Sequence, residues 1–435
     1  MAERTDILIL GAGITGLDLA RRLTAGGRSV LVLENTPHTG GLARTLEHAG
    51  HPFDLGGHRL YFEDKALENG LVQLLGPHNL ETLAKKSSIC LDGNLLPYPP
   101  SPFGAIPYLF HGLFGLPGRR KAAGAAGSLK DWLLSNFNEK IHDVYFRDYT
   151  LKVWGLPTEA ISASWADRRI GRINLLKMAG DVLLGRASVK ENVSTFKYPR
   201  GGIGALPAAL EKAVGPGGKV LTGAEPLAFR REGARLASLT YRLAGEEREV
   251  FFDRAVSTIP VNELARLLGL EQPARYRELI VFFALLEKPA PLKEHWVYFA
   301  DKDLIFSRAC ELVNWDPAFR KGPLYPMTFE LFCDKGDTLW NAPDAELARR
   351  VGEDLKKVAP LAGAVIKDYK AVRVEYAYPL LHLDYEKALA GFTAAADAQQ
   401  NLSLAGRNGT HSYFDIEECL KASEDLAKEL CGSRT

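Results

Sequence analysis

The sequence predicts an α/β protein with a Rossmann-like, dinucleotide-binding domain made of discontinuous segments and a second, mixed α+β domain. Three observations predict this fold class. The chain opens with a glycine-rich strand-to-helix junction, buried strands later return to the same unit, and the pieces between them differ in pattern. With 435 residues, of which 46% are hydrophobic, the chain is too long for one ordinary domain.

The first element is a βαβ unit. A short apolar strand runs into Gly11, Gly13 and Gly16, and the next apolar run, 30–33, ends at Glu34. The first glycine makes the tight turn, the second lets backbone amides approach a pyrophosphate, and the third lets helix pack on strand. The acidic residue can accept a hydrogen bond from a ribose hydroxyl. Because all these parts agree, we predict a bound dinucleotide rather than an empty glycine turn.

A second pair of glycines follows, with an arginine and a threonine close behind, and leads into the alternating run 51–59. This segment resembles the flavin signature of the group that contains monoamine oxidases, protoporphyrinogen oxidases, phytoene desaturases and UDP-galactopyranose mutases. The resemblance implies FAD, and no motif for covalent attachment is present. It places cofactor contacts at Gly40, Gly41, Arg44, Thr45, Gly57 and His58.

The chain then returns to this domain twice. The pattern from 219 to 260 predicts a strand, a β-meander and another buried strand, and in the resembled group this block touches the adenosine end of the cofactor, here at Val220. The last return is a strand at 401–404, a loop, and a helix from about 415 to 430 with Asp415 as its N-cap. A helix start offers amides to phosphate oxygens. The contacts placed here are Gly406, Arg407, Asp415 and Ile416.

These returns define the domain organisation. We predict a cofactor domain of residues 1–65, 201–265 and 386–435, and a substrate domain of residues 66–200 and 266–385.

The two pieces of the substrate domain differ in pattern. The first reads as mainly helical, with a capping box from Ser128 to Asp131. The second reads as a sheet, because the runs 278–286, 295–299 and 328–332 are rich in β-formers. One clear helix, 344–358, follows these strands.

Motifs in the substrate domain indicate which family of this group the sequence resembles most. The block from Tyr149 through Trp154, followed by arginines at 168–172, resembles a block of the UDP-galactopyranose mutases. The segments around Arg308 and from Gly406 onward are second and third matches in the same order. The match is imperfect, since Val153 stands where the mutases typically carry glutamine. For substrate binding we select Tyr149, Arg169 and Arg172.

Physical chemistry suggests roles for the remaining candidates. Guanidinium groups bind phosphate or carboxylate through paired donors, an indole can form one wall of a site, and a histidine beside the flavin can orient the ring or move a proton. The alternatives are purely structural roles: ion pairs for the arginines, core packing for the tryptophan and a structural role for the histidine. The residues selected for catalysis are His58, Trp154, Arg308, Tyr378 and Tyr413.

The function predicted is that of an FAD-dependent oxidoreductase-type enzyme, closest to the UDP-galactopyranose mutases, with an anionic, nucleotide-sugar or glycan-related substrate. Flavin N5 supplies the difficult step. Net oxidation and redox-neutral isomerisation both fit, and NAD(P)H is a candidate external reductant. The alternative is dehydrogenation of a large apolar or tetrapyrrole substrate. The proline-punctuated segment 98–110 motivates it, as a lid or membrane-touching entrance, against a plain helical cap.

Composition limits other functions. A net charge of +1 argues against a protein whose main work is binding nucleic acid. Five cysteines without metal-ligand spacing predict reduced thiols, no metal site and a cytoplasmic location. No apolar run approaches the roughly 18 residues of a membrane span, so we expect no stable insertion, while peripheral contact and the oligomeric state stay open.

Overall fold

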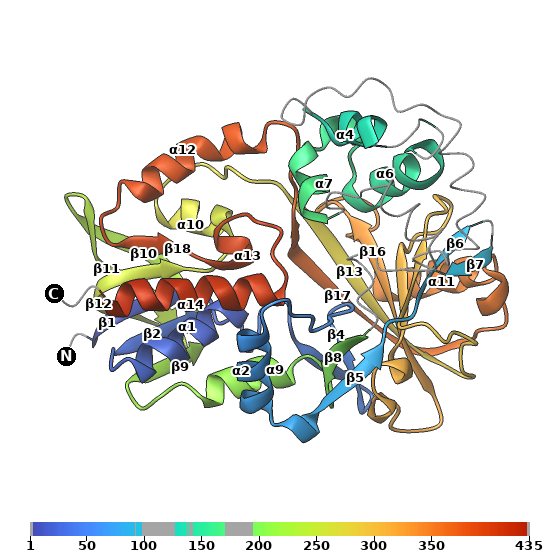
Figure 1. Cartoon of the computed structure of the whole chain (residues 1–435), viewed down its shortest axis with the longest axis horizontal. Coiled ribbons are helices and arrows are strands. Elements are labelled where there is room, and N and C mark those ends of the chain that lie inside the picture. The colour runs from blue at the N-terminus through green and yellow to red at the C-terminus, as the bar shows by residue number, and fades with distance from the viewer. Residues whose placement is uncertain are drawn as a thin grey trace, which may run out of the picture.

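The computed structural model describes residues 3–91, 93–97, 127–136, 139, 142–169 and 195–432. Two large sheets organise these residues, and Figure 1 shows them in the two halves of the molecule, with both termini beside the first. The first sheet has the order β10-β11-β12-β1-β2-β9, with β18 paired to β12. The second has the order β17-β13-β16-β15-β14-β6-β7. The limits of the two predicted domains remain predictions.

The first sheet is parallel at its centre. Strands β12, β1, β2 and β9 pair in parallel, as does β18 with β12, whereas β10 and β11 are antiparallel. The bounds are β1 (Glu3–Leu10), β2 (Val30–Glu34), β9 (Gly218–Thr222), β10 (Ala224–Glu232), β11 (Arg235–Leu243), β12 (Glu246–Ser257) and β18 (Leu402–Leu404).

Helices cover this sheet because its strands are apolar on both faces. Side chains of β1 and β2 on one face form a buried cluster with α1 (Ile14–Ala25), α9 (Ala205–Lys212) and α14 (Ile416–Gly432). The other face packs on α10 (Val261–Leu267) and α12 (Tyr385–Asp397). The predicted βαβ unit and C-terminal helix are confirmed, whereas the last meander strand and the buried run after it form one strand, β12.

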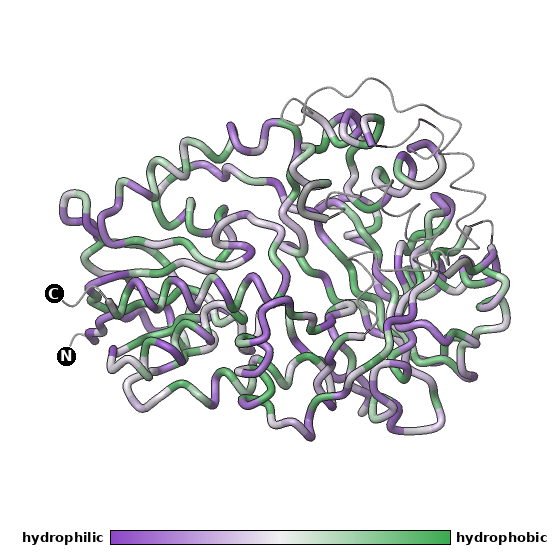
Figure 2. The backbone as a smooth tube through the Cα atoms, viewed as in Figure 1, coloured by the Kyte–Doolittle hydropathy of each residue, from purple (hydrophilic) through white to green (hydrophobic). Residues whose placement is uncertain are grey.

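The second sheet is mostly antiparallel and packs on α11 (Asp344–Leu355) through a large apolar cluster. Figure 2 shows hydrophobic stretches along its inner strands. Its bounds are β6 (Ser87–Leu91), β7 (Asn94–Pro97), β13 (Tyr276–Leu286), β14 (Trp296–Phe299), β15 (Arg308–Glu311), β16 (Tyr325–Cys333) and β17 (Ile366–Pro379). The three predicted strands are confirmed, and the helix predicted at 344–358 is present but ends at Leu355.

The described residues of the piece 66–200 include strands as well as the helices that its pattern predicts. Within it β6 and β7 form a hairpin that extends the second sheet through parallel pairing of β6 with β14. Short strands of this kind are fixed by a distant partner, which the local pattern does not reveal. Two small two-stranded sheets lie elsewhere in the chain: β3 (Thr45–His48) pairs with β4 (His51–Asp54), and β5 (Leu80–Ala84) pairs with β8 (Thr195–Pro199). The remaining helices are α2 (Lys65–Leu75), α4 (Leu129–Asn136), α6 (Asp148–Trp154), α7 (Ala163–Arg169) and α13 (Gly406–Gly409), and a π-helical turn spans His142–Arg147.

The predicted capping box is confirmed at the start of α4. The hydroxyl of Ser128 donates to the carboxylate of Asp131 at 2.7 Å, and the backbone amide of Asp131 donates back to that hydroxyl. Gly155 then ends α6 in a left-handed conformation, φ +66°, where a side chain would be strained. This ending fixes the orientation of Trp154, one residue earlier.

Candidate active site

The glycine-rich turn after β1 has the geometry that its sequence predicts. Gly11 has φ +97°, and a Cβ on Gly16 would stand 2.0 Å from the carbonyl oxygen of Gly11, so helix and turn are in direct backbone contact. A Cβ on Gly13 would meet nothing within 4 Å. Gly13 therefore faces open space at the start of α1, which has no side-chain cap for its amides.

Glu34 lies at the end of β2 beside this turn. Its carboxylate accepts from the amide of Ala12 at 3.0 Å and from the amide of Thr36 at 2.9 Å. The register sets Glu34 opposite Thr222 at the carboxyl ends of β2 and β9, and Val220 lies two residues before that end of β9. The cofactor contact of Val220 remains a prediction.

The second glycine pair packs on the first turn. The amide of Gly40 donates to the carbonyl of Ala12 at 2.8 Å, and a Cβ on Gly41 would stand 3.3 Å from the Cα of Gly13. Arg44 follows, half-buried, with an Nε that has no hydrogen-bond partner among the described residues. Burial lowers the pKa of Arg44, and Glu34 opposes this. Arg44 also lines a cavity of about 640 Å³.

Thr45 and Gly57 are held by protein groups. The hydroxyl of Thr45 donates to the buried carboxylate of Asp54 at 2.6 Å and accepts from the amide of Gly204. The amide of Gly57 donates to Glu330 at 3.4 Å. Sequence reasoning did not single out Asp54, which also accepts from Tyr198 and Ile203. Burial raises the pKa of Asp54 to about 6.

The C-terminal return closes the same edge. A Cβ on Gly406, which has φ +76°, would stand 2.5 Å from the hydroxyl of Thr15 in the first turn of α1. Asp415 and Glu418 form a reciprocal capping box, at 2.8 and 3.0 Å, so Ile416 begins α14 as predicted. The side chain of Asp415 is thus occupied by the helix that it caps.

This edge fits a dinucleotide. Several buried polar atoms in its segments have no partner in the described part of the chain, among them Nε of Arg44, Oγ of Ser257 and Nε of Arg407. Unpartnered buried donors are costly, and an anionic ligand with hydroxyls can satisfy them. With the open approach at Gly13, the residues suited to hold FAD are the first two glycine turns, Glu34, Arg44 and the Gly406 turn.

Four of the predicted site residues form an aromatic cage with a cation. The rings of Tyr378 and Tyr413 stack with centroids 5.6 Å apart, and Trp154 meets them edge-on at 5.8 and 5.9 Å. The guanidinium carbon of Arg407 lies 4.9 Å from the Tyr378 ring and 4.5 Å from the Tyr413 ring. Arg407 also donates to the carbonyls of Phe414 and Ala377, which fixes its position.

A buried ion pair borders this cage. Arg308 on β15 pairs with Glu330 on β16, whose side chain is 1% exposed, and also donates to the hydroxyl of Tyr378 at 3.4 Å. Burial alone would lower the pKa of Arg308, but the Glu330 carboxylate raises it above its usual value. The Nε of Arg308 has no partner among the described residues. Arg308 is therefore a fixed cation with a free donor.

Tyr149 and His58 complete the group. Tyr149 packs edge-on against Tyr298 at 6.4 Å, and burial raises its pKa while the nearby Arg308 opposes this. The Nδ1 of His58 lies 3.1 Å from the carbonyl of Gly56. Burial lowers the pKa of His58 to about 4, although this carbonyl opposes the shift, and Arg308 and Arg407 lower it further. The imidazole is therefore neutral at ordinary pH.

The structure thus brings together all five residues selected for catalysis, with Tyr149 and Arg407. Their catalytic and cofactor roles remain predictions. Arg172 and the segment 98–110 lie outside the described residues, and only the backbone of Arg169, at the end of α7, is described. Sequence reasoning missed Glu330, although a lone charge in the apolar strand 325–333 was a signal for it.

Two further findings concern the described residues only. They contain no group of three or more His, Cys, Asp or Glu side chains that could hold a metal ion. None of their helices is both long and apolar enough to cross a membrane.

Comparison with known proteins gives a family and a fold. A family model described as flavin containing amine oxidoreductase matches residues 14–431. The structure is similar to that of a reduced UDP-galactopyranose mutase, with a TM-score of 0.83 and 19% identity over 98% of this chain and 94% of that chain. It is also similar to a putative protoporphyrinogen oxidase from Exiguobacterium, with a TM-score of 0.76 and 14% identity over the full length of both chains.

Similarity to curated sequences is short. A putative flavin-containing monoamine oxidase of Mycobacterium tuberculosis, AofH, is 46% identical over 52 residues, which are 12% of this chain and 12% of that protein. An inactive all-trans-retinol 13,14-reductase of Danio rerio is 35% identical over 72 residues, 17% of this chain and 11% of that protein. The matched segment therefore spans about a tenth of the length of these relatives.

Proposed function

Because the chain belongs to the flavin-containing amine oxidoreductase family, we propose that it is a flavin-dependent enzyme that acts on an anionic, nucleotide-sugar or glycan-related substrate in the manner of a UDP-galactopyranose mutase. The cofactor proposed is FAD, held without a covalent bond. When bound, its isoalloxazine ring supplies the chemistry at N5.

One observation carries the proposal: beside the aromatic cage, a cation is fixed by a buried carboxylate and keeps a donor without a partner among the described residues. Glu330 and Tyr378 hold Arg308, and its Nε has no partner in the described chain. A site for a purely apolar substrate has no use for such a donor, because an unpartnered buried N–H costs about 1–3 kcal/mol. A phosphate or carboxylate would satisfy it.

The neighbouring side chains have distinct roles in this proposal. Trp154, Tyr378 and Tyr413 provide flat apolar walls that exclude water and pack against a sugar ring. Burial raises the pKa of Tyr378 to about 12, so its hydroxyl stays protonated. Neutral His58 can accept or donate a hydrogen bond at the edge of the site without adding charge beside the two arginines.

The test is a thermal-shift screen of the flavin-loaded protein against UDP, UDP-sugars and protoporphyrin, in oxidised and dithionite-reduced forms. We expect UDP to stabilise the wild type and Arg308→Ala to abolish this shift. Arg349→Ala is the matched control, since Arg349 lies exposed on α11, where it pairs with Glu346 and Glu353. Arg308→Lys keeps the charge but loses the planar donors, and should retain a reduced shift.

The outcomes separate the two candidate functions. A shift with protoporphyrin and none with UDP would overturn the mutase-like proposal in favour of an oxidase or desaturase. If UDP-sugars bind, many turnovers sustained by a catalytic amount of NAD(P)H or dithionite would establish redox-neutral isomerisation. Consumption of one reductant or acceptor per turnover would instead establish net oxidoreduction.

A further inference from the structure

The short helix α13 ends in a way that glycine usually provides. The amide of Ser412 donates to the carbonyl of Arg407 at 2.9 Å, and the amide of His411 donates to the carbonyl of Asn408 at 3.4 Å. This pair of bonds is a Schellman ending, in which the residue after the C-cap adopts a left-handed conformation. His411 occupies that position with φ +47°. A side chain there costs about 1 kcal/mol relative to glycine.

The imidazole of His411 is buried, with 2% of the residue exposed. Neither ring nitrogen makes a hydrogen bond of standard geometry among the described residues. Burial lowers the pKa of His411 to about 4 and His382 lowers it further, while a backbone contact with Leu380 opposes the shift, so the ring is neutral. A buried imidazole with so little hydrogen bonding adds to the backbone cost. We therefore expect the ring to contribute through packing.

The packing partner is Tyr276 on β13. The two rings meet edge-on, with centroids 4.9 Å apart and planes at 89°. Tyr276 is itself anchored, because its hydroxyl donates to the carbonyl of Asn408 and accepts from the amide of Val261. Its ring also meets Tyr376 edge-on at 4.9 Å. The His411 ring thus rests on a fixed surface behind the turn.

The two residues that this turn presents to the site flank His411 in sequence. Arg407 precedes it and Tyr413 follows it, and both meet in the aromatic cage with Tyr378. A change in the backbone at 411 would change the angle between the segments that carry them. We propose that His411 is a positioning residue, whose ring, packed on Tyr276, fixes the turn that brings Arg407 and Tyr413 together. The proposal rests on the site described above and not on the identity of its substrate.

Three substitutions separate the ring from the backbone. His411→Phe keeps an aromatic ring and removes both ring nitrogens, so it should melt at the wild-type temperature or above. His411→Gly relieves the backbone strain but loses the ring, and His411→Ala loses the ring and keeps the strain. Ala244→Gly is the control for strain relief alone, because Ala244 has φ +53° in the β11–β12 turn, far from the site in sequence.

The readouts are the FAD dissociation constant of the apoprotein and the visible spectrum of the bound flavin. We expect the Ala and Gly variants to bind FAD about tenfold more weakly, with a changed spectrum, and the Phe variant to stay within about twofold of the wild type. Ala244→Gly should not affect flavin binding. Should UDP fail to bind the wild type, the proposed function fails while these flavin readouts still test His411.

Two results would overturn the inference. If His411→Phe is as impaired as His411→Ala, a polar contact of the imidazole positions the turn rather than its packing. If both small variants bind FAD like the wild type with an unchanged spectrum, the turn is set without the ring. His411→Gly keeps the test decisive should the alanine variant not fold.

Discussion

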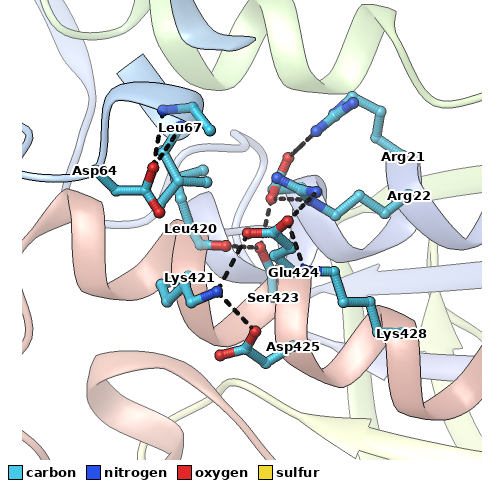
Figure 3. A network of polar contacts seen from close by, with 12 residues as sticks. Arg21, Arg22, Asp64, Leu67, Leu420, Lys421, Ser423, Glu424, Asp425 and Lys428 are labelled. Atoms are coloured by element: carbon cyan, nitrogen blue, oxygen red, sulfur yellow. Dashed lines mark hydrogen bonds and ion pairs between the residues drawn. The ribbon is translucent and has the colours of Figure 1, made fainter. Parts of the chain in front are cut away.

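Two buried carboxylates of this protein, each 1% exposed, are paired with arginine in different ways. Asp18 in α1 accepts from Arg21 at 2.5 Å, from Arg22 at 2.7 Å and from the hydroxyl of Ser423 in α14. Figure 3 shows this contact between α1 and α14, called the α1–α14 seam below, in which Arg22 on α1 also faces Glu424 on α14. Glu330 forms an ion pair with one arginine, Arg308, and accepts one long hydrogen bond from the backbone amide of Gly57.

The difference lies in what remains unpartnered. At the α1–α14 seam both carboxylate oxygens of Asp18 accept hydrogen bonds. Among the described residues, the side chains that donate to Asp18 have no buried donor without a partner. At the aromatic cage, the Nε atoms of Arg308 and Arg407 are buried without partners in the described chain. A closed network stabilises the fold, whereas an incomplete one leaves hydrogen-bonding capacity for a ligand. Substitutions should therefore affect stability at the seam and binding at the cage.

The largest effect on stability is expected at the seam. Asp18→Ala should lower the free energy of unfolding by about 3 kcal/mol, because it removes the acceptor of two arginines and a buried hydroxyl. Urea denaturation followed by circular dichroism measures this. Arg349→Ala, which breaks exposed pairs on α11, should cost under about 1 kcal/mol. Equal losses in the two variants would remove the distinction between closed and exposed networks.

At the cage the expected effect is on binding. Glu330→Gln keeps the shape of the side chain but loses its charge, so Arg308 is held less firmly. We expect about tenfold weaker binding of the anionic ligand identified in the thermal-shift screen, and a smaller change in unfolding free energy than in Asp18→Ala. Titration calorimetry measures the affinity. A variant that binds normally but unfolds early would show that Glu330, like Asp18, is structural.

The sequence predicted the cofactor-binding turns better than the distant partners of the site residues, for a physical reason. The glycine turns, Glu34 and the α14 cap depend on local backbone geometry, so each has a local signal. Glu330, Asp54 and Tyr276 act through partners far away in the chain, and no local pattern names the partner. The hairpin of β6 and β7 was missed for the same reason, since its place in the sheet depends on β14.

A third buried carboxylate extends the comparison to a case without arginine. Glu311 on β15 is 4% exposed, one of its oxygens has no partner among the described residues, and the like charge of Glu294 acts on it. Burial raises the pKa of Glu311 to about 7, and Glu294 raises it too, against a Leu292 backbone bond that lowers it. Glu311 is thus the least supported of the three.

Among the three carboxylates, a gain in the free energy of unfolding is expected only from the Glu311→Gln substitution. Since the folded-state pKa of Glu311 lies above its unfolded value, its contribution to stability is present below about pH 4.5 and is lost as the pH rises through about 7. Glutamine has no such dependence. The variant should therefore be more stable than the wild type by about 1–2 kcal/mol at pH 8, with the difference shrinking toward pH 5.

Urea unfolding at the two pH values measures this gain as a difference between variant and wild type. Burial raises the pKa of Asp54 to about 6. Asp54 therefore adds the same pH dependence to the free energy of unfolding of both proteins, and this contribution cancels from the difference. An equal difference at both pH values would mean that Glu311 does not ionise in this range. A loss of stability at pH 8 would mean that its charged form has a partner, and the order from Asp18 through Glu330 to Glu311 would no longer follow the number of donors around each carboxylate.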